Sequence, residues 1–343
     1  MSDGALENYK RQRRKISENF PETLVSKQWF SVCSLSVLVF TTTLVITSEP
    51  ASRVTGSESS IETSCNGLHL TPSDRALKYM ILGASGSSCV IQLFRVVVSF
   101  FKANLKNTFS AYSIAFTIMS ISFMGEVIMM TGNFDSICED PFGVKSAVIQ
   151  IAEWQTTVPM MLYLCLSLDT TKSTLGLRDY SILLAGYVGV LSGFMPILLS
   201  WQMGVCALIL SVVLVIYALV MNVVNGYYAY LSSVERGISN PVDYVCFAIS
   251  RRRLQCSIYL FGICLFFPVT FFSRVFVIID TPTMFTIFSV LNFISKNLFA
   301  ILLMEGHLEV LDPAMYQLLA EKTANATKRA FIRYVFHEVM PIT

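Results

Sequence analysis

Two ionisable side chains lie inside strongly apolar stretches of the sequence: Lys296 within SVLNFISKNLFAILL (289–303) and Glu153 within AEWQTTVP (152–159). A charge at the centre of a bilayer costs roughly 2.5–3.5 kcal/mol on insertion scales, so such residues usually serve a function or pair with each other. A lysine amine in an apolar site can condense with an aldehyde, and a nearby carboxylate keeps the resulting Schiff base protonated. A purely structural ion pair is the alternative.

The composition places both residues in a membrane protein. The chain has 343 residues, of which 54% are hydrophobic and 14% charged, with a mean hydropathy of +0.60. A soluble domain carries about 25% charged residues, and apolar blocks of about 20 residues can cross a ~30 Å hydrocarbon core as helices. We predict an all-α membrane protein, surrounded by membrane lipids and without a nucleic-acid partner. Its eight predicted spans are 29–47, 77–101, 109–131, 146–168, 180–200, 204–230, 254–279 and 284–304.

The basic residues predict the side of the membrane on which each end lies. The segment YKRQRRK (9–15) precedes the first block, and basic loops favour the cytoplasmic side. Eight crossings then return the C-terminus to the cytoplasm, so we expect both termini there. The expected domains are a basic cytoplasmic tail (1–27), an N-terminal transmembrane helix (28–47), a seven-helix bundle (77–304) and a cytoplasmic helical extension (305–343).

Few other residues in the sequence could take part in binding or catalysis. Arg95 and Arg274 lie within about two turns of a span end, where long side chains reach the headgroups. Glu126 is shorter and lies nearer the span interior, so its role stays open. Cys65 and Cys138 fall in loops on the oxidising outer side, where they form either a disulfide or two separate thiols. The sequence shows no metal-ligand cluster and no nucleophile with a paired base, so we expect neither a metal site nor catalytic residues.

The surroundings of Glu153 and Lys296 resemble two signatures of the microbial rhodopsins. In that family the third of seven helices carries an acid followed by Trp, then Thr four residues and Pro six residues after the acid. The matching positions here are Glu153, Trp154, Thr157 and Pro159. A lysine in the middle of the family's last helix binds retinal as a Schiff base, and NFISK places Lys296 there. The resemblance implies retinal as cofactor on Lys296 and Glu153 as its counterion, and Thr157 can hydrogen-bond that carboxylate.

Weaker matches extend the resemblance over 77–304. The segment IAFT (114–117), followed by Gly125, is similar to the family's second helix, and Pro268 is similar to the proline of its sixth. The first apolar block is then an extra helix before the usual seven. Such helices are a feature of enzyme-linked rhodopsins, whose output domains include kinases, cyclases and phosphodiesterases. The implied architecture is a seven-helix retinal-binding bundle with one extra N-terminal transmembrane helix.

Aromatic residues near the proline are candidates for the retinal pocket. Phe266, Phe267 and Phe271 surround Pro268, and Trp154 would offer a flat face to the polyene. Aromatic residues in membrane spans belong to the helix core at least as often, so core packing is the alternative for each.

Three departures from the family pattern narrow the function. Four residues before the lysine the family usually has a second carboxylate, whereas this chain has Asn292. An arginine commonly precedes the acid by three residues, where Gln150 stands here. Outward proton pumps carry a further carboxyl group three turns along the third helix, at the position of Leu164. Because a pump needs groups that accept, release and resupply protons, we do not expect an efficient proton pump.

The C-terminal extension offers a weaker resemblance. The segment KRAFIRYVFHEV (328–339) resembles the start of a histidine kinase dimerisation domain, in which a His-Glu pair presents the phosphate-accepting imidazole. His337 and Glu338 match, but Met340 and the early Pro341 depart from the pattern, and no ATP-binding domain follows. The resemblance implies a homodimer and the membrane part of a truncated enzyme-linked rhodopsin. An amphipathic linker that would precede a cyclase or phosphodiesterase equally well is the alternative.

Together these features predict a light sensor. Light would isomerise retinal, Glu153 would take the Schiff-base proton, and helix movement would reach a cytoplasmic signalling partner or output enzyme. A light-gated ion channel is the first alternative, since channels of this family also lack pump carboxylates. A carrier with an intramembrane Lys–Glu pair and no pigment is the third class.

Overall fold

Eight long helices dominate the described part of the molecule. The computed structural model describes residues 24–48, 72–101, 106–131, 137–139, 145–168, 175–199, 201–235, 241–311 and 328–329. In chain order the elements are α2 (Leu24–Ser48), α3 (Pro72–Phe101), α4 (Lys106–Thr131), β1 (Ile137–Glu139), β2 (Lys145–Ala147), α5 (Val148–Ser167), α6 (Leu177–Phe194), the 3-10 helix η2 (Met195–Leu198), α7 (Trp201–Glu235), α8 (Pro241–Val275) and α9 (Thr281–Leu311).

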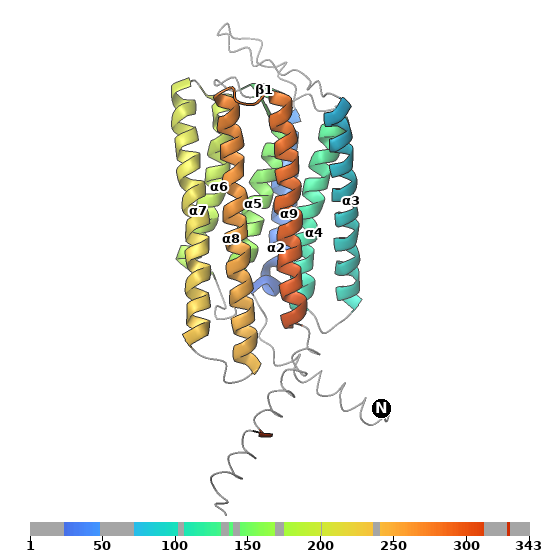
Figure 1. Ribbon diagram of the computed structural model, residues 1–343, viewed down its shortest axis with the longest axis vertical. Coiled ribbons are helices and arrows are strands. Elements are labelled where there is room, and N and C mark those ends of the chain that lie inside the picture. The colour runs from blue at the N-terminus through green and yellow to red at the C-terminus, as the bar shows by residue number, and fades with distance from the viewer. Residues whose placement is uncertain are drawn as a thin grey trace, which may run out of the picture.

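The helices form one bundle with their axes nearly parallel (Figure 1). Each helix from α3 to α9 packs against the next along the chain, and α9 returns to α3, so these seven close a ring. The helices run alternately up and down, so α2 begins and α9 ends at the same end of the bundle, opposite the β1 hairpin (Figure 1). We call the end of the bundle at which the β1 hairpin lies the hairpin end.

Helix α2 packs outside this ring, against α4 and α5. The Trp29 ring meets Phe109 of α4 edge-on with centroids 5.1 Å apart. The Tyr163 hydroxyl of α5 donates a hydrogen bond to Gln28 Oε1 at 3.2 Å, and the Thr117 hydroxyl of α4 lies 3.3 Å from Cys33 Sγ. Mixed aromatic and polar contacts therefore attach the first half of α2 to α4 and α5.

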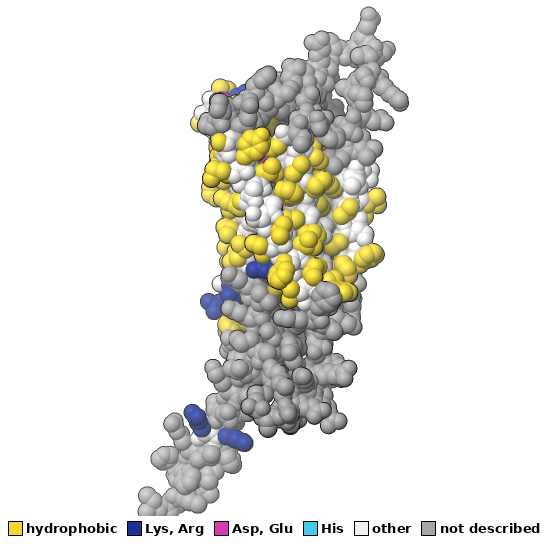
Figure 2. Space-filling model, turned by 90° about the vertical axis from the view of Figure 1, so that its right-hand side faces the viewer, with side chains coloured by type: hydrophobic (Ala, Val, Ile, Leu, Met, Phe, Trp, Pro, Cys, Tyr) yellow, Lys and Arg dark blue, Asp and Glu magenta, His cyan; other side chains and the backbone are white. Residues whose placement is uncertain are grey.

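Five of the predicted spans are long and apolar enough to cross a membrane by themselves, and they lie in α3, α4, α7, α8 and α9. Their outward faces carry exposed hydrophobic side chains, which cover the middle of the face shown in Figure 2. Helices α5 and α6 are not among these five, and α5 turns nearly all its side chains inward, including Gln150, Glu153 and Thr156. In α2 the described side chains cover 28–42 of a helix that runs from Leu24 to Ser48. The chain is a multi-pass membrane protein, and the three remaining crossings stay predictions.

Glycines bring α6 unusually close to its neighbours. A Cβ placed on Gly189 would lie 3.0 Å from the backbone nitrogen of Val215 in α7, and one on Gly193 would lie 2.8 Å from Ser211 Oγ. Small residues four apart let two membrane helices approach backbone to backbone. This close α6–α7 contact holds the helices that form one end of the site described below.

Two short connections shape the hairpin end. The strands β1 and β2 pair antiparallel, with Cys138 opposite Ser146, and β2 leads directly into α5. Sequence analysis did not predict this hairpin. Between α8 and α9, Val277 takes a positive φ of 58°, and Asp280 caps α9 by accepting a hydrogen bond from the Thr283 N–H at 2.9 Å. The hydrogen bonds from Thr283 lower the pKa of the exposed Asp280 carboxyl, so α9 starts at a well-defined residue.

Candidate functional site

The two ionisable residues singled out in the sequence meet inside the bundle. Lys296 of α9 and Glu153 of α5 are 1% and 0% exposed, and the lysine Nζ forms an ion pair with the carboxylate Oε1. Lys296 Nζ also lies 3.4 Å from the hydroxyl of Ser122 on α4. Breaking a buried ion pair by removing one partner typically costs 3–5 kcal/mol. Removing either residue would therefore leave the other as an uncompensated buried charge.

Asn292 holds the carboxylate in place. Its Nδ2 donates to both oxygens of Glu153 at 2.8 Å, and its Oδ1 accepts a hydrogen bond from the Trp154 indole nitrogen at 3.0 Å. Asn292 lies one turn before Lys296 on α9, so one helix face presents both the amine and the amide to Glu153. Sequence analysis treated Asn292 as a missing carboxyl group and did not predict this bridging role.

The predicted contact of Thr157 is wrong. The Thr157 hydroxyl donates to the main-chain oxygen of Glu153 at 2.8 Å and not to its carboxylate. A threonine inside a helix commonly bonds the carbonyl four residues earlier, which satisfies its hydroxyl without any tertiary partner. Thr157 therefore contributes to α5 locally, and Asn292 occupies the carboxylate in its place.

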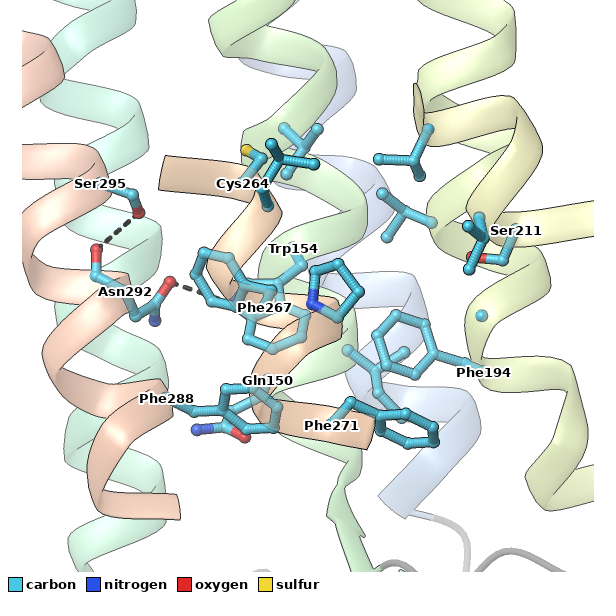
Figure 3. Close-up of a pocket in the computed structure, with 18 of the residues that line it drawn as sticks. Gln150, Trp154, Phe194, Ser211, Cys264, Phe267, Phe271, Phe288, Asn292 and Ser295 are labelled. Atoms are coloured by element: carbon cyan, nitrogen blue, oxygen red, sulfur yellow. Dashed lines mark hydrogen bonds between the residues drawn. The ribbon is translucent and has the colours of Figure 1, made fainter. Parts of the chain in front are cut away.

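An aromatic cavity of about 190 Å³ begins at Lys296. It extends from Asn292 and Ser295 on α9 towards Ser211 on α7 (Figure 3). Apart from these polar groups, Gln150 and Lys296, its walls are almost entirely apolar; the ring-bearing and proline side chains among them are Trp154, Phe194, Phe267, Pro268, Phe271, Phe272, Phe285 and Phe288.

Three of these rings pack tightly beside Asn292. The Trp154 ring meets Phe267 and Phe288 edge-on, with centroids 4.7 Å and 5.3 Å apart, and Phe267 stacks on Phe288 at 5.9 Å. Edge-on and offset pairs are the favoured aromatic geometries. The hydrogen bond from Trp154 to Asn292 also fixes the indole (Figure 3). The rings nearest the lysine therefore form a rigid wall.

The structure places most, but not all, of the predicted pocket residues at the cavity. Trp154, Phe267, Pro268 and Phe271 line it. Phe266 does not, because its side chain is 57% exposed on the outer face of α8. Successive helix residues point about 100° apart, and here the rotation of α8 turns Phe266 outward while Phe267 lines the cavity.

Phe288 and Phe285 line the cavity but were not predicted. They precede Lys296 by eight and eleven residues, a spacing that repeats one helix face, so the periodicity of α9 could have identified them.

The remaining predicted residues lie in different surroundings. Gln150 lines the cavity, whereas Leu164 is fully buried in the hydrophobic core. Arg274 lies at the end of α8 and donates to the Thr281 hydroxyl at 3.1 Å. Cys138 belongs to β1, whereas Cys65 and His337 lie outside the described residues, so the disulfide and the phosphoacceptor stay predictions.

The cavity fits retinal chemically. A long apolar molecule that ends in an aldehyde would lie against the aromatic walls, with its carbonyl carbon at the Lys296 amine. Glu153 and Asn292 are then the groups that would meet the positive charge of the linkage. The polar residues around Lys296 match the aldehyde end of such a ligand, and the apolar walls beyond Lys296 match its long apolar part.

Gly125 of α4 is the point where Glu153 touches a neighbouring backbone. A Cβ there would lie 3.2 Å from Glu153 Oε2, which Asn292 already holds. We expect Gly125→Ala to lower thermal stability, because overpacking costs about 1–3 kcal/mol, and to shift the absorption maximum of the retinal-loaded protein.

The matched control is Gly83→Ala, since nothing lies within 4 Å of a Cβ on Gly83. Melting temperatures and spectra of both variants are the measurement. Equal effects of the two changes would contradict tight packing at Gly125.

Comparisons with known proteins identify the fold. No protein-family model matches the chain, and no curated protein sequence matches it. Among solved structures, the transmembrane domain and linker region of the rhodopsin phosphodiesterase from Salpingoeca rosetta is similar, with 15% identity, a TM-score of 0.59, and coverage of 84% of this chain and 96% of that one. A proton-pumping rhodopsin from the marine alga Acetabularia acetabulum gives 14% identity, a TM-score of 0.54, and coverage of 72% and 99%. A cyanorhodopsin from the cyanobacterium Tolypothrix gives 14% identity, a TM-score of 0.55, and coverage of 74% of this chain and 100% of that one.

Proposed function

We propose that this membrane protein, which has the fold of the microbial rhodopsins, is a retinal-binding light sensor. One observation carries the proposal: a buried lysine, paired with a fixed carboxylate, lies at the mouth of an aromatic cavity. A structural ion pair alone does not need such a cavity. An uncoloured carrier would not need aromatic walls around its charged pair either.

Retinal, when bound, supplies light absorption and a light-driven change of shape. The chain supplies the rest. Lys296 holds the ligand covalently, Glu153 balances the positive charge and is placed to accept a proton from the lysine nitrogen, and Asn292 orients the carboxylate. Trp154 and Phe267 line the cavity and would pack against the ligand, so a change in its shape would press on α5 and α8. The output of the site is therefore helix movement.

The polar groups of the site favour a sensor over a pump. Glu153 is the only carboxyl group that forms a hydrogen bond or ion pair with Lys296 among the described residues. Gln150, Asn292 and Leu164 stand where a pump would place its charged groups, and Leu164 is buried among apolar side chains. A proton that leaves the lysine nitrogen has Glu153 as its acceptor, but Leu164 offers no carboxyl group for its resupply.

We further propose that α2 crosses the membrane and that both termini are cytoplasmic. The likeness to the Salpingoeca phosphodiesterase domain covers 84% of the chain, against 72% for the algal rhodopsin, which supports a counterpart for α2. Helix α9 continues to Leu311, past its apolar stretch, at the end where α2 begins. The signal would leave through α9 to a homodimeric output, with a histidine kinase favoured over a cyclase or phosphodiesterase.

A light-gated ion channel is the second candidate, favoured by the inner face of α3. The buried side chains Lys78, Ser85, Gln92 and Ser99 recur every seven residues on that face, which contacts α4 and α9. Gln92 Oε1 has no hydrogen-bond partner within the described residues. Polar side chains inside a span face the protein interior or a water-filled cavity. A polar layer of this kind could conduct ions when the helices shift.

Electrical recording separates the two candidates. With all-trans retinal added, we expect a visible absorption band but no photocurrent under voltage clamp, and no more light-driven proton movement in vesicles than with Lys296→Ala. A photocurrent that reverses with the ion gradient would establish the channel. Sustained acidification at pump-like rates would refute both candidates, and no visible band would leave the uncoloured carrier.

A further inference from the structure

A second carboxyl group lies beside the Lys296–Glu153 pair without belonging to it. Glu126 of α4 is 2% exposed, and neither of its carboxyl oxygens has a hydrogen-bond partner among the described residues. Its neighbours on α4 locate it: Ser122, one turn earlier, contacts Lys296, and the adjacent Gly125 packs against Glu153. Glu126 therefore lies on the hairpin side of the ion pair, where the proposed function gives it no role.

The partners available to the two acids differ. Glu153 accepts hydrogen bonds from Lys296 and from the Asn292 amide, so its negative charge is well satisfied. The polar group that lies near Glu126 is the Ser289 hydroxyl of α9, which is also fully buried and without a hydrogen-bond partner among the described residues. A buried carboxylate without donors is costly, whereas a neutral carboxylic acid needs only one acceptor for its proton.

The charges that face Glu126 come from three neighbouring helices. Lys78 of α3 and Lys296 of α9 are positive, and Glu153 of α5 is negative. No charged residue lies in the described side chains 28–42 of α2. Lys296 is already paired with Glu153, and the Lys78 ammonium lies over the Phe285 ring at 5.9 Å. Two carboxyl groups that share a buried site do not both ionise readily.

We propose that Glu126 is a proton-binding site: its carboxyl group carries a proton, donated to Ser289 Oγ or an internal water, while Glu153 is ionised. The site then contains two carboxyl groups, one charged and one holding a transferable proton. When Glu126 loses that proton, its O–H bond breaks and the proton passes to an internal water, either directly or through Ser289, whose hydroxyl accepts the proton as it releases its own to that water. The assignment concerns the chain itself and holds with or without retinal.

Infrared spectroscopy of the retinal-free protein at neutral pH tests the site. We expect a carbonyl band of a protonated carboxylic acid, lost in Glu126→Gln. Glu153→Gln should keep the band, because Lys296 then gives up its own proton and Glu126 stays neutral. The matched control is Asp179→Asn, since the buried Asp179 accepts hydrogen bonds from Asn225 at 2.7 Å and Gly176 at 2.9 Å and should be ionised.

Each other outcome overturns the proposal. Absence of the band in the unmodified protein would mean that Glu126 is ionised. Loss of the band in Glu153→Gln or Asp179→Asn, with Glu126→Gln unaffected, would place the proton elsewhere. Because glutamine reproduces the shape and neutral charge of the protonated acid, Glu126→Gln should also melt at the temperature of the unmodified protein. Failure of that variant to fold would count against a neutral Glu126.

Discussion

Replacing Lys296 by alanine will abolish pigment formation with all-trans retinal. The Lys296 amine opens onto the aromatic cavity, and no other lysine of the described residues lines it. The expected loss is complete, because a covalent bond to the ligand cannot form without the amine. Visible absorption after addition of retinal to purified protein is the measurement.

Two further variants make this result specific. Lys296→Ala leaves Glu153 buried without its cation, which typically costs about 3–5 kcal/mol, so the double variant Lys296→Ala/Glu153→Gln removes both charges and should restore stability without colour. Lys78→Ala removes the other lysine that is buried among the described residues, which lies over Phe285 on the hairpin side, and should keep the visible band. A coloured Lys296→Ala, or a colourless Lys78→Ala, would show that the attachment site is wrong.

Lys296 and Glu153 could be found in the sequence because charges inside apolar helices are rare and demand a partner. Their contact follows from two helices whose spans place both residues at a similar depth. The direction of an uncharged side chain is harder to predict. Thr157 lies one turn from Glu153 in sequence, but its hydroxyl bonds the backbone, and Phe266 differs from Phe267 only by the rotation of α8. Helix rotation depends on packing between helices, which motif spacing does not contain.

The same limit applies to the fold. The eight apolar blocks correctly predicted the helices, since each block is longer than a globular strand. The hairpin was missed because its strands have three residues each, too few to show an alternating pattern. Helix α5 is not among the five apolar spans, and protein rather than lipid surrounds it on most sides. A hydropathy threshold selects helices with many apolar side chains, which lipid-facing helices need, so it misses a helix that keeps polar side chains inside a bundle.

Asn292 shows how a departure from a motif can have a structural role. Sequence comparison gives only the loss of a carboxyl group there. In the bundle, the amide donates to both oxygens of Glu153 and accepts from Trp154, which a carboxylate could not do beside another carboxylate. The site thereby keeps one negative charge next to Lys296 and fixes its position. A single, rigid counterion makes the colour of the pigment depend strongly on Glu153.

Glu153→Gln will therefore remove most of the visible band near neutral pH. Without the carboxylate, the buried positive charge on the lysine nitrogen has lost its only ion-pair partner among the described residues. An opposite charge within ~4–6 Å typically changes proton affinity about 10- to 1,000-fold, and burial adds to the loss. The pigment should then absorb in the near ultraviolet. In acid the protonated form should return at longer wavelength, because the charge that stabilised its ground state is gone.

Absorption spectra from about pH 4 to 9 identify which acid is the counterion. They are recorded for the unmodified protein, Glu153→Gln and Glu126→Gln. Acid should shift the unmodified pigment to longer wavelength as Glu153 takes up a proton, and Glu153→Gln should lack that transition. Glu126→Gln should keep the visible band and the acid transition, because the neutral Glu126 contributes no charge and does not contact Lys296. If Glu153→Gln instead kept the band and Glu126→Gln lost it, the charge that holds the proton would lie on α4. Asn292 would then orient an acid that is not the counterion.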